Sequence, residues 1–293
     1  MHVDDVLADA FESHRPRLRA VAYRMLGSLS EADDAVQETW LRLSRSDADA
    51  IENLGGWLTT VASRVCLNML RARATRAEQP FPPHTPDPIV SRVDASDPEH
   101  EALLGDSVGL ALLVVLDTLT PTERLAFVLH DIFAVPFGDV ATILAVSEPA
   151  ARQLASRARR RVGTAPMPDA DPARQRAVVD AFFAASRRGD FAALLTLLDP
   201  DAVLRSDGGP DRVSLSRVLR GGRSIGEQAI MFAQGAPFAQ PAIVNGAAGV
   251  VVARNGQALS VMGFVVRADA IAAIDVLADP VRLSRLDLSP WLG

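Results

Sequence analysis

Apolar positions recur at helical spacing through the first quarter of the chain. The spacing predicts an amphipathic helix from Phe11 to Leu26, and a second helix from Glu31 to Leu43 that Ser30 caps at its N-terminus. A third helix is predicted from Trp57 to about Arg76. Its buried side is expected to carry Trp57, Val61, Val65 and Met69. Three amphipathic helices in succession favour a small all-α domain over residues 1–79.

A second run of helical signals lies in the middle of the chain. Thr120-Pro121-Thr122-Glu123 is a capping box with proline at the first helical position, so an apolar helix is predicted to begin there. A short helix follows from Asp139 to Leu144, Ala145-Val146 forms a turn, and Ser147 caps a last helix. The arginines of this last helix are Arg152, Arg157, Arg159, Arg160 and Arg161. The order predicts a helix-turn-helix with a basic recognition helix.

Two proline-rich stretches separate the predicted domains. Residues 80–98 contain six prolines, and because proline at that density blocks helix and sheet, an extended, semi-rigid linker is predicted. A helix from Glu99 to Leu119 then begins the second helical domain, residues 99–163. A second linker, residues 164–172, leads to a C-terminal domain over residues 173–293.

The last third of the chain changes character. Helices are predicted from Arg174 to Arg188 and from Phe191 to Leu198, and Asn255-Gly256 marks a tight hairpin further on. The predicted strands are Ala242–Val244, Gly249–Ala253, Ala258–Arg267 and Ala270–Leu277. Helices followed by a curved antiparallel sheet indicate an α+β domain. The expected fold class is therefore multidomain, with two all-α domains followed by one α+β domain.

Composition agrees with this organisation. With 293 residues, 48% hydrophobic and 23% charged, the chain has the length and apolar content for two or three folded domains. The formal net charge is −6, and all basic residues are arginine. Four arginines and no acid lie between Arg64 and Arg76, and five more lie between Arg152 and Arg161. Such patches on an acidic chain are typical of phosphate binding, whereas one cluster alone is equally well a solvated helix face.

Cysteine use and the apolar runs bear on the compartment. Cys66 is the single cysteine, so an intramolecular disulfide and a cysteine-cluster metal site are excluded, and a buried thiol in a cytoplasmic protein is expected. The segment Met1–Asp5 has neither a basic region nor an apolar core, and no apolar run approaches the length of a membrane span. We expect no export signal and no membrane segment.

Three helix faces are candidates for binding. One face of the second helix carries Asp34, Gln37, Glu38 and Leu41; it is either a solvated face or a docking surface for a basic partner. A row on the third helix, with side chains able to bind phosphates or base edges, holds Arg64, Asn68 and Arg71. The broad face of the recognition helix holds Arg152, Gln153, Ser156, Arg157, Arg160 and Arg161. Its N-terminal half is expected to contact base edges and its C-terminal arginines phosphates.

The string from Asp33 to Leu43, followed by Trp57-Leu58 and the arginine-rich helix, resembles region 2 of the extracytoplasmic-function sigma factors of bacterial RNA polymerase. The helix-turn-helix from Thr120 to Val162 resembles their region 4. The resemblance implies that the face with Asp34 docks on core RNA polymerase. It also implies that the third helix reads the minus-ten promoter element and the recognition helix the minus-35 element.

The resemblance is not uniform along the chain. Many family members have asparagine in place of Arg64 and aspartate in place of Asn68, so a minus-ten sequence preference does not carry over. In the family, the linker between the two regions crosses the polymerase active-site and RNA-exit region. A passive spacer is the alternative for residues 80–98.

The stretch from Val178 to Asp201 resembles SnoaL-like members of the NTF2-like cone fold. A subgroup of these sigma factors carries such a fused domain, which implies regulation in cis. This chain shares with the subgroup Asp207-Gly208-Gly209, Asn245-Gly246 and the segment Asp279–Leu283. The subgroup's tryptophan-Leu-Pro-Glu-Pro linker string is absent, and Phe81-Pro82-Pro83 stands nearby.

An enzymatic C-terminal domain is the principal alternative. All histidines, the one tyrosine and the one cysteine precede Pro168, so Asp207 and Asp211 are the candidates that remain for acid-base work, and both are expected in a loop. No metal-ligand cluster or phosphate-binding loop is visible. We therefore expect a sigma factor that is not an enzyme, has no cofactor, and binds core RNA polymerase and promoter DNA. A bifunctional protein whose cone binds or turns over a small molecule, and a plain helix-turn-helix repressor, are the alternatives.

Overall fold

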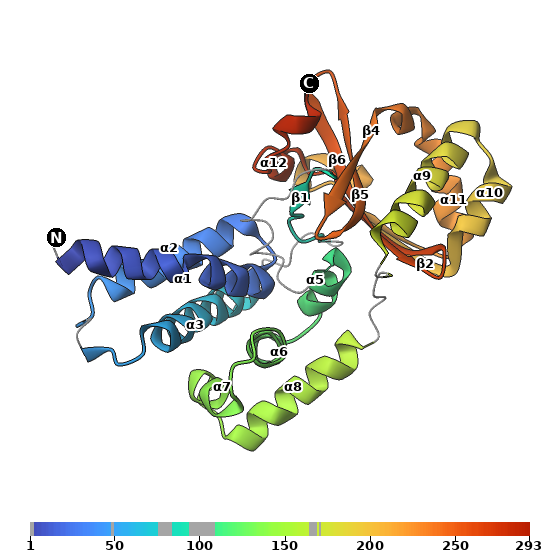
Figure 1. Cartoon of the computed structure of the whole chain (residues 1–293). Coiled ribbons are helices and arrows are strands. Elements are labelled where there is room, and N and C mark those ends of the chain that lie inside the picture. Colours follow the sequence, from blue (N-terminus) through green and yellow to red (C-terminus); the bar gives the residue numbers. More distant parts are fainter. Residues whose placement is uncertain (1–2, 48–49, 76–83, 94–108, 164–168, 170) are drawn as a thin grey trace. The chain divides into compact units, whose positions relative to one another are not determined.

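The computed structural model describes residues 3–47, 50–75, 84–93, 109–163, 169 and 171–293. The chain falls into two units, which Figure 1 colours along the sequence. The helical unit comprises residues 1–79, 98–106 and 115–164, and the sheet unit comprises residues 80–97, 107–114 and 165–293.

The N-terminal part of the helical unit is formed by α1 (Val3–Leu26), α2 (Leu29–Leu43) and α3 (Leu54–Thr75). Their shared core is apolar and contains Phe11, Leu18, Val36, Leu43, Leu58 and Ala62. One local prediction was wrong, because the N-cap of α2 is Ser28 and not Ser30. The predicted buried side of α3 is correct in part: Val65 is buried, whereas Trp57, Val61 and Met69 are half-buried. The fully buried positions of this helix include Leu58, Ala62 and Cys66.

The remaining part of the helical unit contains the predicted helix-turn-helix. Its elements are α6 (Pro121–Phe127), the π-helical turn η2 (Val128–Ile132), α7 (Phe137–Leu144) and α8 (Glu148–Val162). The capping box at Thr120 is confirmed, and so is Ser147 as the N-cap of α8. Ala145 adopts a left-handed conformation with φ of 56° in the turn. On α8 the buried positions are all alanine, which brings the helix close to α6; they are Ala151, Ala155 and Ala158.

Contacts within the helical unit join α6 to the N-terminal helices. Arg124 of α6 is 3% exposed, and its Nε donates to the backbone carbonyl of Arg24 at 3.0 Å while its Nη1 donates to Asp117 at 2.5 Å. Arg17 donates to the carbonyl of Phe133 at 3.1 Å. A buried guanidinium needs such acceptors because an unpaired buried charge is strongly unfavourable.

The sheet unit is built on seven strands in the order β1-β4-β5-β6-β7-β2-β3. The strands are β1 (Val90–Ser91), β2 (Leu198–Asp207), β3 (Arg217–Arg220), β4 (Ala239–Val244), β5 (Ala247–Arg254), β6 (Gln257–Arg267) and β7 (Ala270–Leu277). The Asn255-Gly256 hairpin is confirmed, with positive φ at both residues. The sheet is mixed rather than antiparallel throughout, because β2 and β7 pair in parallel.

Helices α9 (Pro172–Arg188), α10 (Phe191–Leu197) and α11 (Gly222–Met231) gather beside this sheet (Figure 1). With the strands they enclose an apolar core that includes Phe182, Leu194, Ile225, Val250, Phe264 and Ile274. Shorter helices are α5 (Leu110–Asp117), α12 (Pro280–Leu283) and the 3₁₀ turns η3 (Pro210–Leu215), η4 (Ala233–Phe238) and η5 (Ser289–Trp291). The predicted helix from Glu99 to Leu119 is described only from α5 onward, and residues 99–108 lie outside the described residues.

The prediction that the proline-rich linker forms no sheet was wrong. Its residues Val90 and Ser91 form β1, which pairs antiparallel with Val244 and Ile243 of β4. Proline removes the backbone donor at its own position, and β1 lies at the edge of the sheet after the last of the closely spaced prolines, so pairing is not blocked there. Among the described residues, none of the helices combines the length and apolar character needed to cross a bilayer.

Candidate functional sites

The proposed polymerase-docking face lies on the solvent side of α2. Asp34 and Gln37 are exposed, Leu41 is 38% exposed, and Glu38 is half-buried with an ion pair to Arg42 at 2.8 Å. The buried face of the same helix packs on α1 and α3. The four predicted side chains therefore share one accessible surface that combines negative charge with an exposed aliphatic group. Such a surface can dock on a basic partner that also offers an apolar contact.

The candidate minus-ten residues lie on the exposed side of α3. Arg64, Asn68 and Arg71 are all exposed. Arg64 already has a partner in the helical unit, because its Nη2 donates to the backbone carbonyl of Thr142 in α7 at 3.2 Å. A guanidinium held by a single carbonyl keeps further N–H groups for a phosphate or a base edge.

The candidate minus-35 face is the exposed side of the recognition helix α8. All six residues predicted on this face are exposed; they are Arg152, Gln153, Ser156, Arg157, Arg160 and Arg161. Arg152 forms an ion pair with Glu148 and lies 4.6 Å above the ring of Phe137. These contacts position its guanidinium near the N-terminus of α8, the end that a recognition helix presents to base edges.

Glu123 ties the recognition helix to the start of α6. Its carboxylate accepts from Thr120 as part of the capping box and lies 3.2 Å from Arg161 and 3.5 Å from Arg157. Burial in itself raises the pKa of Glu123, but the hydroxyl and N–H of Thr120 and the charges of both arginines hold that pKa below its ordinary value. Arg157 is thus shared between the fold and the proposed DNA face.

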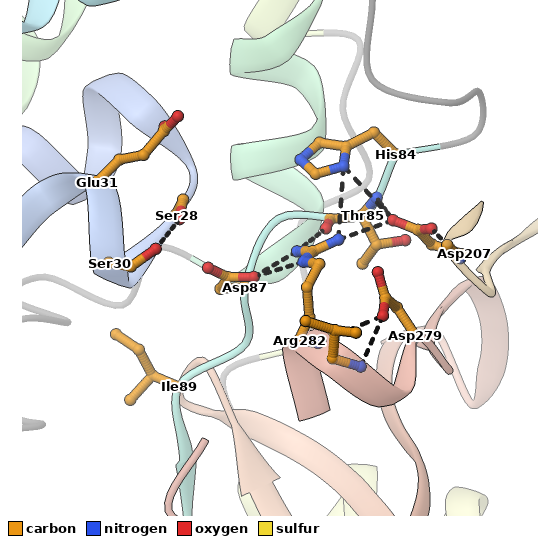
Figure 2. A network of polar contacts seen from close by, with 12 residues as sticks. Ser28, Ser30, Glu31, His84, Thr85, Asp87, Ile89, Asp207, Asp279 and Arg282 are labelled. Carbon is orange, nitrogen blue, oxygen red and sulfur yellow. Dashed lines mark hydrogen bonds and ion pairs between the residues drawn. The ribbon is translucent and has the colours of Figure 1, made fainter. Parts of the chain in front are cut away.

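A third site lies in the sheet unit, where the proline linker meets the end of β2, the turn between β4 and β5, and helix α12. We call this site the linker clamp; its members are His84, Thr85, Asp87 and Ile89 from the linker and Asp207, Asn245 and Arg282 from the domain. Figure 2 shows Arg282 between Asp87 and Asp207, with Thr85 and His84 beside them. The linker residues Thr85 to Val90 are all buried.

Arg282 is the centre of the linker clamp. Its Nε donates to Oδ1 of Asp87 at 2.8 Å, its Nη1 to Oδ2 of Asp207 at 2.8 Å, and its Nη2 to the carbonyl of Thr85 at 2.5 Å. The N–H of Thr85 donates to the same Asp207 oxygen at 3.0 Å, and Nδ1 of His84 lies 3.4 Å from it. A guanidinium has a planar fork of donors that suits several acceptors at once.

Asn245 holds the other end of the linker segment. Its side-chain Oδ1 accepts from the N–H of Ile89 at 3.0 Å, and its own N–H donates to the carbonyl of Ile89 at 2.9 Å. Asn245 and Gly246 both have positive φ, so their loop turns sharply between β4 and β5. The Asn-Gly loop thereby reproduces a strand-like pairing directly before β1.

The Asp-Gly-Gly loop needs its glycines for close approach. A Cβ on Gly208 would lie 2.2 Å from the carbonyl oxygen of Arg212, and one on Gly209, where φ is +65°, would lie 2.3 Å from Oδ2 of Asp279. Asp279 in turn caps α12 by accepting from the N–H of Val281 and of Arg282. The loop and the cap together orient Arg282 toward the linker.

Asp207 is ionised in this arrangement. Burial raises its pKa, but the hydrogen bonds from His84, Thr85 and Gly209 and the charge of Arg282 outweigh burial and lower the pKa below the ordinary aspartate value. A buried carboxylate with these donors carries the negative charge that Arg282 needs. Asp207 is therefore a structural anion at the base of the linker clamp, whereas Asp211 is exposed in η3.

Sequence reasoning selected Asp207, Gly208, Asn245 and Gly246 as regulatory loops, and the structure brings Asp207 and Asn245 to the linker. It missed the linker side of the same contact. The sequence did contain a signal for this contact, namely Asp87 between Pro86 and Pro88. If such a proline segment packs against a domain, its carboxylate is buried and needs a cationic partner.

Comparison with known proteins places both helical parts in one family. The model for Sigma-70 region 2 matches residues 10–76, and that for Sigma-70 region 4 matches residues 109–162. The chain is 43% identical over 214 residues to the ECF RNA polymerase sigma factor SigJ of Mycobacterium tuberculosis, covering 72% of this chain and 68% of SigJ. It is 40% identical over 204 residues to the probable ECF sigma factor SigI of the same species, covering 68% and 69%.

The fold comparison extends over nearly the whole chain. The crystal structure of the Mycobacterium tuberculosis extracytoplasmic function sigma factor SigJ aligns with a TM-score of 0.78 and 35% identity, over 96% of this chain and 99% of that one. The expected fold class, two all-α sigma domains followed by an α+β domain, is confirmed. The chain therefore belongs to the extracytoplasmic-function family of RNA polymerase sigma factors.

Proposed function

We propose that this sigma factor directs core RNA polymerase to promoters with a minus-10 and a minus-35 element, and that its NTF2-like domain regulates it in cis through the linker clamp. The observation that carries the regulatory part is the ion pair of Arg282 with Asp87 and Asp207, which fastens the linker to the C-terminal domain. The cytoplasm is the proposed compartment, because polymerase and chromosome are there.

For polymerase docking we propose the α2 face with Asp34, Gln37, Glu38 and Leu41. Its support is joint exposure on one helix side opposite a packed core. Charge sets the association rate and the exposed leucine adds apolar contact, so the two contributions are separable by mutation.

For promoter recognition we propose one face on each helical domain. Arg64, Asn68 and Arg71 would contact the minus-10 element, and Arg152 with Gln153 would contact minus-35 base edges. The accompanying residues Ser156, Arg157 and Arg160 would hold phosphates. Two observations support this assignment: all eight side chains are exposed, and they carry positive charge and no negative charge.

The regulatory proposal rests on competition for the linker. In the clamp the linker is buried against the C-terminal domain and its backbone is bonded to Asp207 and Asn245. A linker that passes through the polymerase cannot keep these contacts unchanged along its length. The NTF2-like domain would therefore shift the balance between a clamped and a released linker, and with it the activity of the polymerase complex.

A pull-down with purified core RNA polymerase tests the docking part. We expect the full chain to co-elute, the double variant Asp34→Arg with Leu41→Ala to lose at least tenfold in affinity, and Asp9→Arg on the exposed side of α1 to behave as the unmodified protein. Equal co-elution of all three proteins contradicts the docking face. Absence of co-elution for the unmodified chain contradicts the proposed function as a whole.

In vitro transcription from a cognate promoter tests the regulatory part. Arg282→Ala is expected to change the yield of transcript at saturating polymerase, whereas Arg285→Ala, an exposed arginine of the same segment, is expected to leave it unchanged. A bifunctional protein that turns over a small molecule in its cone is the alternative. It is not favoured, because among the described residues none of those lining the cone is a carboxylate, histidine, cysteine or tyrosine.

A further inference from the structure

The NTF2-like domain contains a cavity of about 420 Å³ between its sheet and helices α9 and α11. This volume falls in the range of sites that bury a small organic molecule. The cavity belongs entirely to the sheet unit and is lined by residues of the C-terminal domain. The linker clamp uses different side chains, so the cavity is a feature the regulatory contact does not explain.

The walls of the cavity are predominantly apolar. Aromatic and aliphatic side chains from helices and strands face it, among them Phe182, Phe183, Ile225, Leu259, Met262 and Ile274. Phe232 also lines the cavity and is 51% exposed, so this residue marks the mouth. Close packing is the rule in protein interiors, and a hollow of this size lined by such residues suits an apolar ligand body.

One end of the cavity is polar. The strand register places Arg217 of β3 opposite Ser206 of β2, Ser206 opposite Val276 of β7, and Val276 opposite Met262 of β6. Residues paired across strands point to the same side of the sheet, and all four line the cavity. A single row across the sheet floor thus runs from a cation through a hydroxyl to apolar side chains.

The described part of the chain offers no anion to the cation at this end. Arg217 donates from Nη1 to Oε1 of Gln228 at 3.2 Å and from Nη2 to the carbonyl of Ser214. Arg212, which also lines the cavity, donates to the carbonyl of Ala278 at 3.3 Å. Both arginines are half-buried, and among the described residues no carboxylate lies within ion-pairing distance of either. A half-buried guanidinium bonded only to neutral groups favours a ligand that brings negative charge.

We propose that the cone binds an apolar monocarboxylate with an extended body, with the carboxylate at Arg217 and Ser206 and the body along Val276 and Met262. The row across the sheet fixes this orientation. Binding rather than turnover is assigned, because the lining residues within the described chain include no group suited to general acid-base chemistry. The site is independent of the promoter and polymerase surfaces.

Calorimetric titration of the full chain with decanoate tests the proposal, with decan-1-ol as the uncharged probe of the same length. We expect one saturable site and at least tenfold tighter binding of decanoate than of decan-1-ol. Arg217→Gln should reduce decanoate affinity to the level of decan-1-ol and leave decan-1-ol binding unchanged. Arg220→Gln, an exposed arginine of the same strand, is the matched control and should bind both probes normally.

A second variant keeps the test independent of the folding of Arg217→Gln. Ala229→Trp places a large side chain on the cavity wall and should abolish binding of both probes, while the circular dichroism spectrum stays that of the unmodified protein. The proposal is overturned by the absence of saturable decanoate binding or by equal affinity for the two probes in the unmodified chain. Undiminished binding to Ala229→Trp overturns the cavity as the site.

Discussion

Arg282 and Asp207 lie 75 residues apart in the chain and form an ion pair with 2.8 Å between Nη1 and Oδ2. The same oxygen accepts the N–H of Thr85 from the linker at 3.0 Å, and Arg282 also binds Asp87. The two residues of the C-terminal domain therefore hold the linker jointly. Removing Asp207 leaves the buried N–H of Thr85 without its acceptor, and removing Arg282 leaves the carboxylates of Asp87 and Asp207 without their cation.

The first prediction concerns Arg282→Ala. Loss of its charge-assisted bonds should weaken the linker contact by about 2 kcal/mol, which corresponds to about 30-fold faster amide hydrogen exchange. The affected amides are those of Thr85 and Ile89, and hydrogen exchange detected by mass spectrometry measures them. Arg285→Ala serves as the control. Unchanged exchange of the segment in Arg282→Ala would show that Arg282 does not hold the linker.

The second prediction concerns pH. The folded-state pKa of Asp207 is below the ordinary value of 3.8, so its contribution is complete above that value and is lost as the pH falls through the lower folded-state pKa. Exchange of Thr85, corrected for its intrinsic rate, should differ between the unmodified protein and Asp207→Asn by a constant factor from pH 8 to about pH 5. The difference should shrink below the ordinary aspartate pKa. A difference that grows on acidification would contradict the lowered pKa of Asp207 in the folded state.

The third prediction concerns the recognition helix. Arg152→Ala should weaken binding to a cognate minus-35 element by about 1 to 3 kcal/mol if it contacts a base edge. Arg157→Ala should weaken binding to all duplexes alike and reduce the salt dependence, as expected for a phosphate contact. Fluorescence anisotropy at several salt concentrations measures both. Unchanged transcription from a cognate promoter after both substitutions would remove this face from the DNA interface.

Arg159→Ala is the comparison within the same helix. Arg159 forms an ion pair with Asp131 at 2.5 Å and lies outside the proposed face. Its substitution should have a smaller effect on DNA affinity than Arg152→Ala. An effect of equal size would indicate general electrostatic attraction in place of a defined contact.

The fourth prediction concerns the capping box. Thr120→Ala removes the side-chain acceptor for the N–H of Glu123, and should lower the stability of the helical unit by about 0.5 to 2 kcal/mol. Urea unfolding followed by circular dichroism measures it. The control is Thr60→Ala, whose hydroxyl donates to the carbonyl of Gly56 in its own helix. Equal loss of stability in both variants would mean that the cap contributes nothing of its own.

Features with a local cause were predictable from the sequence. The capping box at Thr120, the N-cap Ser147 and the Asn255-Gly256 hairpin each depend on side chains and backbone within a few residues. The choice of Ser30 over Ser28 failed because both are good capping residues two positions apart and tertiary packing decides where α2 begins.

Features that depend on distant partners were not predictable. Strand β2 follows α10 directly and is stabilised by parallel pairing with β7, which lies far along the chain. The two-residue strand β1 exists only through its pairing with β4. For the candidate sites, helical spacing predicted which side chains share an accessible face on α2, on α3 and on α8. The linker residues of the clamp could not be predicted in this way, because their role depends on where Arg282 lies in the folded domain.

Two hydrogen bonds hold the N-terminal helices against the helix-turn-helix: Arg124 donates to the carbonyl of Arg24, and Arg64 donates to the carbonyl of Thr142. They limit the distance along DNA that the two parts of the helical unit can span. Elements centred near positions minus 10 and minus 35 are about 25 base pairs apart, which is about 85 Å along B-form DNA at about 3.4 Å per base pair. If α3 reads the minus-10 element and α8 the minus-35 element, as we propose, the helical unit cannot meet both elements while α3 stays in contact with α7, which packs on α8. On this proposal the promoter-bound form breaks these two bonds, and the apparent affinity for polymerase and promoter is then reduced by the fraction of molecules that are open.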